Sequence, residues 1–81
     1  MIKACPKCKA EGGQGAIYKA KILDLGIELN ICDECEAFWT KDQIISKGNF
    51  KILTPFLEEN KLTYDNAKIE DLGYLENETE A

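Results

Sequence analysis

Two Cys-x-x-Cys pairs constrain the fold of this chain more than any other feature. They are Cys5-Pro6-Lys7-Cys8 and Cys32-Asp33-Glu34-Cys35, with 23 residues between Cys8 and Cys32. A Cys-x-x-Cys turn places both sulfurs on one side of a tight loop, and two such loops complete a tetrahedron around a zinc ion at about 2.3 Å per sulfur. The sequence therefore predicts one metal site whose four ligands are Cys5, Cys8, Cys32 and Cys35.

The alternatives are two disulfides, free core thiols or a redox dithiol. The chain shows no apolar run of the kind found in a signal peptide, and no stretch approaches the length of about 20 apolar residues that spans a membrane. We therefore expect a soluble, cytoplasmic protein without a membrane partner, and a reducing compartment favours metal over disulfides. A thioredoxin-like dithiol fits less well, because the first pair neither follows a strand nor opens a βαβ unit.

The segment between the two pairs predicts a β-hairpin. Residues 16–22 and 27–31 alternate like strands, and Asp24-Leu25-Gly26 supplies a turn between them. Four thiolates saturate a tetrahedral ion, so we expect the metal to be structural and not catalytic.

Lysines close to the first pair are expected to serve the metal site. Four thiolates around Zn²⁺ leave a local charge of about −2, which nearby cations can offset through space. The candidates are Lys3, Lys7 and Lys9.

The two pairs, with Phe38-Trp39 following the second, resemble the knuckles of zinc-ribbon and rubredoxin-like proteins. The resemblance covers residues 5–39 and implies a zinc ribbon with a three-stranded antiparallel sheet. With the one to three short α-helices expected after it, the chain would have a small α+β fold. Such knuckles usually carry a small residue directly after the second cysteine, where the backbone needs a positive φ. This chain has Lys9 and Glu36 at those positions.

Two further points follow from the resemblance. A tetrahedral Cys₄ site also accepts iron, so a rubredoxin-like electron carrier is the rival interpretation, although such carriers are mostly shorter and we expect zinc. Over its whole length the chain is loosely similar to small bacterial zinc-ribbon proteins, some of which are toxin immunity factors.

The sequence divides into three parts. Residues 1–39 are expected to form the Cys₄ zinc ribbon, residues 40–69 to supply short helices that pack on it, and residues 70–81 to form an acidic C-terminal tail with a frayed end.

The first of these helices is expected over residues 41–47. Thr40 and Gln43 have the spacing of a capping box, and Gly48 supplies a stop. In that helix Ile44 and Ile45 would pack toward Phe38 and Trp39. The two aromatic residues are expected to be core, and the alternative is an exposed recognition patch.

Two more helices are expected downstream. Thr54-Pro55 marks a helix start with proline at the first position, or else one helix runs from about residue 50 and bends at Pro55. A further short helix over residues 63–69 would be capped by Thr63 or Asp65.

Composition argues against an enzyme. The chain has no histidine, no glycine-rich phosphate loop and no nucleophile motif, and its predicted metal is saturated. It also lacks arginine and has a net charge of −5, which makes nucleic acid an unfavourable partner.

We therefore expect a non-catalytic zinc-binding protein–protein interaction module whose partner carries a basic surface. An immunity protein that neutralises a basic nuclease toxin is one concrete version. The alternative is a nucleic-acid-binding zinc ribbon of a transcription or translation accessory factor. It would use the basic N-terminal segment, whose cations are Lys3, Lys7, Lys9, Lys19 and Lys21. Nothing in the sequence assigns the partner-binding residues or the oligomeric state.

Overall fold

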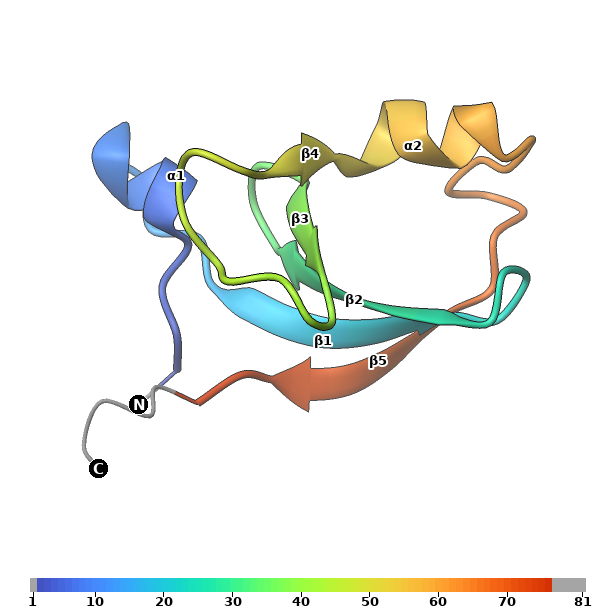
Figure 1. The fold of residues 1–81 in the computed structure, drawn as a ribbon, viewed down its shortest axis with the longest axis horizontal. Helices are drawn as coiled ribbons and strands as arrows, with labels where there is room; N and C mark the ends of the chain where they lie inside the picture. The colour runs from blue at the N-terminus through green and yellow to red at the C-terminus, as the bar shows by residue number, and fades with distance from the viewer. Residues whose placement is uncertain (1, 77–81) are drawn as a thin grey trace.

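A computed structural model describes residues 2–76 of the chain. Over this range it contains five strands and two short helices (Figure 1). In chain order they are α1 (Pro6–Ala10), β1 (Ile17–Ile22), β2 (Ile27–Cys32), β3 (Ala37–Thr40), β4 (Lys51–Ile52), α2 (Leu53–Glu59) and β5 (Ile69–Tyr74).

The strands form one antiparallel sheet in the order β4-β3-β2-β1-β5. The first four strands follow one another as a meander, and after α2 the chain returns to the opposite edge, where β5 pairs with β1. The small α+β class is confirmed. The expectation of three strands is wrong, because the described part of the chain has five, and the two additional strands come from segments that were assigned to helices and to the tail.

The predicted hairpin is confirmed as β1 and β2. Ile22 is paired with Ile27, and the Gly26 amide donates to the Ile22 carbonyl across 2.8 Å. Gly26 has a φ of 67°, a conformation that glycine adopts without steric cost. The turn residue and the alternating pattern therefore set the register together.

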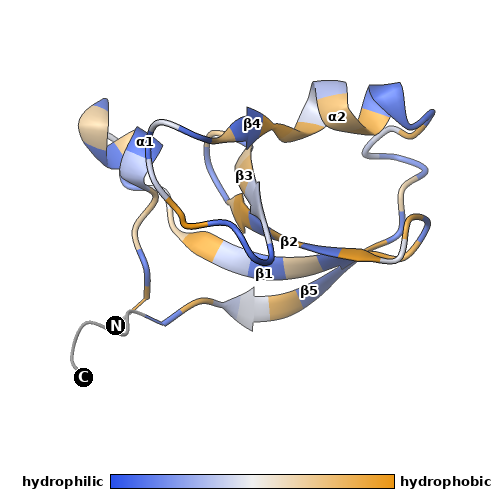
Figure 2. Ribbon diagram, in the orientation of Figure 1, coloured by the Kyte–Doolittle hydropathy of each residue, from blue (hydrophilic) through white to orange (hydrophobic). Residues whose placement is uncertain are grey.

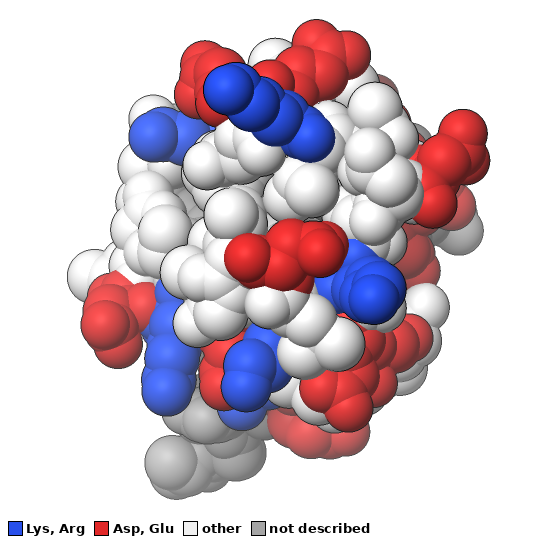
Figure 3. Space-filling model, turned by 90° about the vertical axis from the view of Figure 1, so that its right-hand side faces the viewer, with Lys and Arg blue, Asp and Glu red and all other residues white. Residues whose placement is uncertain are grey.

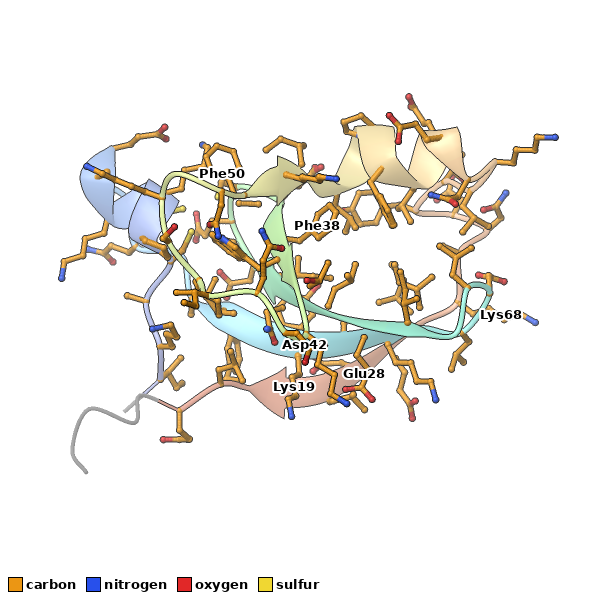
Figure 4. The ribbon with its side chains drawn as sticks, viewed as in Figure 1. Lys19, Glu28, Phe38, Asp42, Phe50 and Lys68 are labelled. Carbon is orange, nitrogen blue, oxygen red and sulfur yellow. The ribbon has the colours of Figure 1, made fainter. Side chains whose placement is uncertain are left out.

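One face of the sheet packs against α2. Because side chains alternate along a strand, every second residue of β1 and β2 points to this side, and Leu53 and Leu57 of α2 are buried against them. Phe38 of β3 points into the same layer (Figure 4). The centroid of its ring lies 4.9 Å from that of the Phe56 ring. The ribbon of α2 accordingly turns hydrophobic residues toward the sheet (Figure 2). The buried members of this layer are Ala20, Ile22, Leu29, Ile31, Phe38, Leu53 and Leu57.

The second buried cluster surrounds Trp39, which has no exposed surface. It joins the tryptophan to the cysteines, and partly buried Ile45 and Phe50 cover it from the loop over residues 41–50. Phe38 and Trp39 are therefore core residues, which confirms the core interpretation and excludes the exposed patch. Ile44 departs from the expectation, since it is 82% exposed.

The helix predicted over residues 41–47 is absent, and an irregular loop takes its place. Part of the capping box does form, because the Thr40 amide donates to Gln43 Oε1 across 2.9 Å. The Trp39 indole then donates to the Ser46 carbonyl at 3.0 Å and to Asn49 Oδ1 at 2.8 Å. The Asn49 side-chain amide donates in turn to the Ile44 carbonyl at 2.8 Å. These side-chain bonds replace the helical ones.

The second helix begins two residues earlier than Pro55, at Leu53. Proline is therefore in the first turn but not at the first position, and Thr54 makes no capping bond of its own. The alternative of one bent helix from residue 50 is also wrong, because residues 51–52 form β4.

The third helix is reduced to a single turn. The Ala67 amide donates to the Thr63 carbonyl at 2.8 Å, and Thr63 and Asn66 cap each other. The chain then enters β5, so residues 70–74 belong to the sheet and not to a tail. Of the tail that was expected over residues 70–81, residues 77–81 lie outside the described range.

Candidate metal centre

The two Cys-x-x-Cys pairs lie together at one end of the sheet. Cys5 immediately precedes α1 and Cys8 lies inside it, whereas Cys32 ends β2 and Cys35 lies in the turn before β3. All four sulfurs are within 4.8 Å of one another, and the group could hold a metal ion. Cys5, Cys8 and Cys32 are buried and Cys35 is partly exposed.

The sulfur separations match a tetrahedral thiolate site. The Cys5 and Cys35 sulfurs are 3.7 Å apart, and those of Cys8 and Cys32 are 3.6 Å apart. A tetrahedron with metal–sulfur bonds of 2.3 Å has edges of about 3.8 Å. A disulfide would need about 2.0 Å, and all four cysteines are free. The cluster thus has the dimensions of a site for a four-coordinate metal ion.

Backbone amides point at every sulfur of the group. Such donors favour the thiolate form, which is the form that ligates a metal. The bonds run from the amide of Cys8 to the Cys5 sulfur, from Gly15 to Cys8, from Glu34 and Cys35 to Cys32, and from Ala37 to Cys35.

Burial and the contacts between the thiols shift the pKa values of the cysteines in different directions. Burial raises the pKa of Cys8 and of Cys32 above the ordinary value for a thiol. Burial also opposes ionisation of Cys35, but the Ala37 amide and the three neighbouring thiols outweigh it, so the pKa of Cys35 is lowered. The surroundings therefore favour the thiolate form of Cys35, whereas burial disfavours ionisation of Cys8 and Cys32.

Lys7 is the predicted lysine that the structure connects with the cluster. Its hydrogen bond to Glu11 raises the pKa of Lys7, and the charges of Cys35 and Cys8 act in the same direction. Its ammonium group also lies 5.4 Å from the centre of the Phe50 ring. The expected offset of thiolate charge thus has a structural basis at Lys7.

Gly15 contributes to this site although its sequence position gave no sign of it. A Cβ atom placed on Gly15 would lie 2.5 Å from the Cys32 sulfur and 2.8 Å from the Cys8 sulfur. The backbone of residue 15 therefore packs directly against the thiols. Only a residue without a side chain permits this approach.

The two knuckles differ in backbone conformation. Glu36, which follows Cys35, has a φ of 64°, as the position after a second cysteine was expected to need. Lys9, which follows Cys8, is instead part of α1. The first pair continues into a helical turn, and the positive φ appears later, at Gly12 with 83°. The expectation for Lys9 is therefore wrong.

Glu36 has a second role that the sequence did not reveal. Its carboxylate accepts from the Thr54 hydroxyl at 2.6 Å and from the Thr54 amide at 3.3 Å. The Leu53 amide donates to the Glu36 carbonyl at 3.0 Å. Glu36 thereby satisfies amides in the first turn of α2, which has no local cap.

Comparison with known proteins adds no assignment, since no protein-family model, curated protein or solved structure matches the chain significantly. The cysteine cluster is consistent with a zinc-ribbon-like knuckle. Within residues 2–76, neither helix has the length and apolar character needed to cross a bilayer.

Proposed function

We propose that this protein is a non-catalytic module that holds one zinc ion through Cys5, Cys8, Cys32 and Cys35 and binds another protein. The observation that carries the metal assignment is the sulfur geometry, with separations of 3.6 and 3.7 Å between opposing pairs. Four thiolate ligands leave no open coordination position, so the ion would serve the fold and not a reaction.

The position of the cluster supports a structural role. Three of the four cysteines are buried, and they belong to the same hydrophobic cluster as Trp39 and Ile17. An ion there would join α1 to the β2–β3 turn. Binding free energies of about 10–16 kcal/mol are typical of structural zinc at neutral pH, and a chain of this size has a small core of its own.

Elemental analysis of the purified full-length protein tests the metal assignment. We expect one equivalent of zinc and a colourless protein, and replacing Cys8 and Cys32 by serine should abolish metal retention. A red protein with one equivalent of iron would show that the site holds ferric iron instead of zinc. A well-folded protein that takes up neither metal would refute the site.

Charge supports a basic protein partner. The chain has 15 acidic and 10 basic residues, and complementary charge raises association rates and selects partners. The two signs are nevertheless interspersed with neutral side chains on the end of the molecule that Figure 3 shows. Recognition would therefore depend on a local surface more than on the excess of acid.

One concrete version is an immunity protein against a nuclease toxin, because such a toxin carries a basic groove for its own substrate. The test is co-expression with a toxin encoded beside the gene, which should restore growth. A gel-shift titration with mixed RNA and DNA at low salt tests the nucleic-acid alternative. Micromolar binding or tighter would favour that alternative and contradict the proposal.

A further inference from the structure

Two of the three tyrosines of the chain meet across neighbouring strands, and the third lies within electrostatic range of them. Tyr18 of β1 and Tyr74 of β5 are direct cross-strand partners, and their rings meet edge to face with centroids 6.2 Å apart. Tyr64, in the connection after α2, interacts electrostatically with Tyr18 and lies beside Thr54. Two distant strands thus contribute one aromatic pair, and a third segment places Tyr64 in its neighbourhood.

These rings are accessible. Tyr64 and Tyr74 are each 48% exposed, and Tyr18 is half-buried. Tyrosine at this exposure offers a large, rigid contact area with a polar tip, which is the reason it is enriched in protein interfaces.

Carboxylates surround the same rings. Tyr74 donates to Asp33 across 2.8 Å, and this bond followed by the negative charge of Asp33 raises the pKa of Tyr74. Burial, then the charges of Asp71 and Asp33, raise the pKa of Tyr18. Burial, then the charge of Glu36, raise that of Tyr64. The tyrosines therefore share a negative electrostatic environment.

The lysines of β1 point to the face of the sheet opposite to Tyr18. Lys19 and Lys21 alternate with Tyr18 and Ala20 along β1, so their side chains leave the opposite face of the sheet. Figure 4 shows Lys19 on the side of the sheet that faces away from α2. The negative potential around the tyrosines is thus not cancelled from β1.

We propose that Tyr18, Tyr64 and Tyr74, together with Asp33 and Asp71, form a tyrosine surface that binds an arginine- or lysine-rich segment of a partner protein. The inference rests on the proposed function as a protein-binding module and specifies its surface. Cations are attracted to the faces of aromatic rings, and guanidinium groups also pair with carboxylates. A basic segment meets both kinds of group here.

A selection experiment tests this surface without a known partner. A displayed library of random short peptides is selected on the immobilised, zinc-loaded, full-length protein, and the enriched peptides are synthesised for calorimetric titration. We expect the enriched sequences to be rich in arginine and lysine. Replacing Tyr64 or Tyr74 by alanine should weaken their binding about fivefold or more.

Two matched controls separate the surface from general charge. Ile44→Ala removes a more exposed hydrophobic side chain from the loop over residues 41–50, and binding should change less than about twofold. Asp71→Asn and Asp42→Asn remove the same charge, but only Asp71→Asn should weaken binding. Tyr74→Phe keeps the aromatic ring but removes its hydrogen bond to Asp33. Zinc content is measured for every variant, so that a loss of binding is not confused with a damaged metal site.

Each outcome has a meaning. Peptides that are enriched but not basic, or basic peptides equally sensitive to Asp42 and Asp71, overturn the tyrosine surface and leave a protein-binding function standing. A failure to enrich any peptide overturns the surface as a peptide-binding site, whereas zinc content and the gel-shift titration judge the proposed function separately.

Discussion

The hydroxyl group of Tyr74 donates a hydrogen bond to Oδ2 of Asp33 across 2.8 Å, between residues 41 positions apart. Asp33 lies between Cys32 and Cys35, and its Oδ1 accepts from the Ala16 amide at 3.0 Å. The Asp33 amide donates back to the Ala16 carbonyl at 3.0 Å. One side chain therefore fastens the second knuckle both to the last strand and to the segment that precedes β1.

We expect Asp33→Ala to accelerate the transfer of zinc to a competing chelator by about tenfold, near the low end of what outer-shell partners contribute to metal affinity. The physical reason is that the turn between Cys32 and Cys35 would lose two hydrogen bonds that orient it. Transfer is measured with a chromogenic chelator in excess.

Asp42→Ala is the matched control, because it removes an exposed acid outside the knuckle and should leave the transfer rate unchanged. Equal rates for the two variants would show that the bonds of Asp33 do not hold the knuckle.

The cysteine cluster and the hairpin could be predicted because short sequence motifs indicate both of them. The spacing of the cysteines identified all four residues that the structure brings within 4.8 Å. The alternation over residues 16–22 and 27–31, with Gly26 in the turn, predicted β1 and β2 closely. In both cases short motifs carry the signal, namely the two Cys-x-x-Cys turns and the hairpin turn with its glycine.

The loop over residues 41–50 could not be predicted, because a side-chain donor just before it competes with the capping signal. Thr40 and Gln43 do form part of their capping box. The buried indole of Trp39 requires an acceptor, however, and it finds two in Ser46 and Asn49. A helix over residues 41–47 would leave that indole without its partners.

β5 was missed for a different reason. Its sequence, with Glu70, Asp71 and Gly73, has the composition of a solvated tail, and five of its six residues are exposed. It becomes a strand because it pairs with β1, through a register irregularity between Lys19 and Ala20. Pairing between such distant segments leaves no periodic pattern in an exposed edge strand.

Gly15→Ala should damage the metal site. The new methyl group would lie 2.5 Å from the Cys32 sulfur, a separation that forces either the thiols or the backbone to move. We expect the free energy of unfolding of the zinc-loaded protein to fall by about 1–3 kcal/mol, as for other overpacked cores. Thermal unfolding and zinc stoichiometry measure the effect.

Gly48→Ala is the control for this change, since a Cβ at Gly48 meets no atom within 4 Å and its φ is ordinary. An unchanged zinc affinity in Gly15→Ala would mean that the backbone of residue 15 does not limit the site.

Glu36 and Lys61 adopt nearly the same strained conformation, with φ of 64° and 62°. Glycine relieves this strain, so Lys61→Gly should raise the free energy of unfolding by about 0.5–1 kcal/mol. Glu36→Gly should lower it by about 1 kcal/mol, because the carboxylate that accepts from Thr54 at the start of α2 is also lost. Urea unfolding of the zinc-loaded variants measures both.

The two glycine substitutions are thus expected to change the free energy of unfolding in opposite directions. Glu36→Gln retains an acceptor for Thr54 and should stay closer to the parent protein. If Glu36→Gly were as stabilising as Lys61→Gly, the bonds to Thr54 would contribute nothing to the stability of α2.

Metal removal should unfold at least the N-terminal half of the protein, because the ion replaces a core that residues 1–39 are too few to build. Trp39 is the only tryptophan, has no exposed surface and packs in the cluster that contains the cysteines. A strong chelator should therefore shift its fluorescence to longer wavelength and reduce the far-ultraviolet circular dichroism. Unchanged spectra after verified metal removal would contradict the structural role.

Acid should have the same effect as the chelator, and the direction follows from the thiols. An ordinary thiol is protonated at neutral pH, and burial raises the pKa of Cys8 and Cys32 further, whereas a metal-bound thiolate carries no proton. Binding thus releases at least these two protons, and apparent zinc affinity should fall by about 100-fold or more for each unit of acidification. Competition titrations with a chelator of known affinity, between mildly alkaline and mildly acidic pH, measure the slope. An affinity that does not change with pH would mean that these thiols are not the ligands.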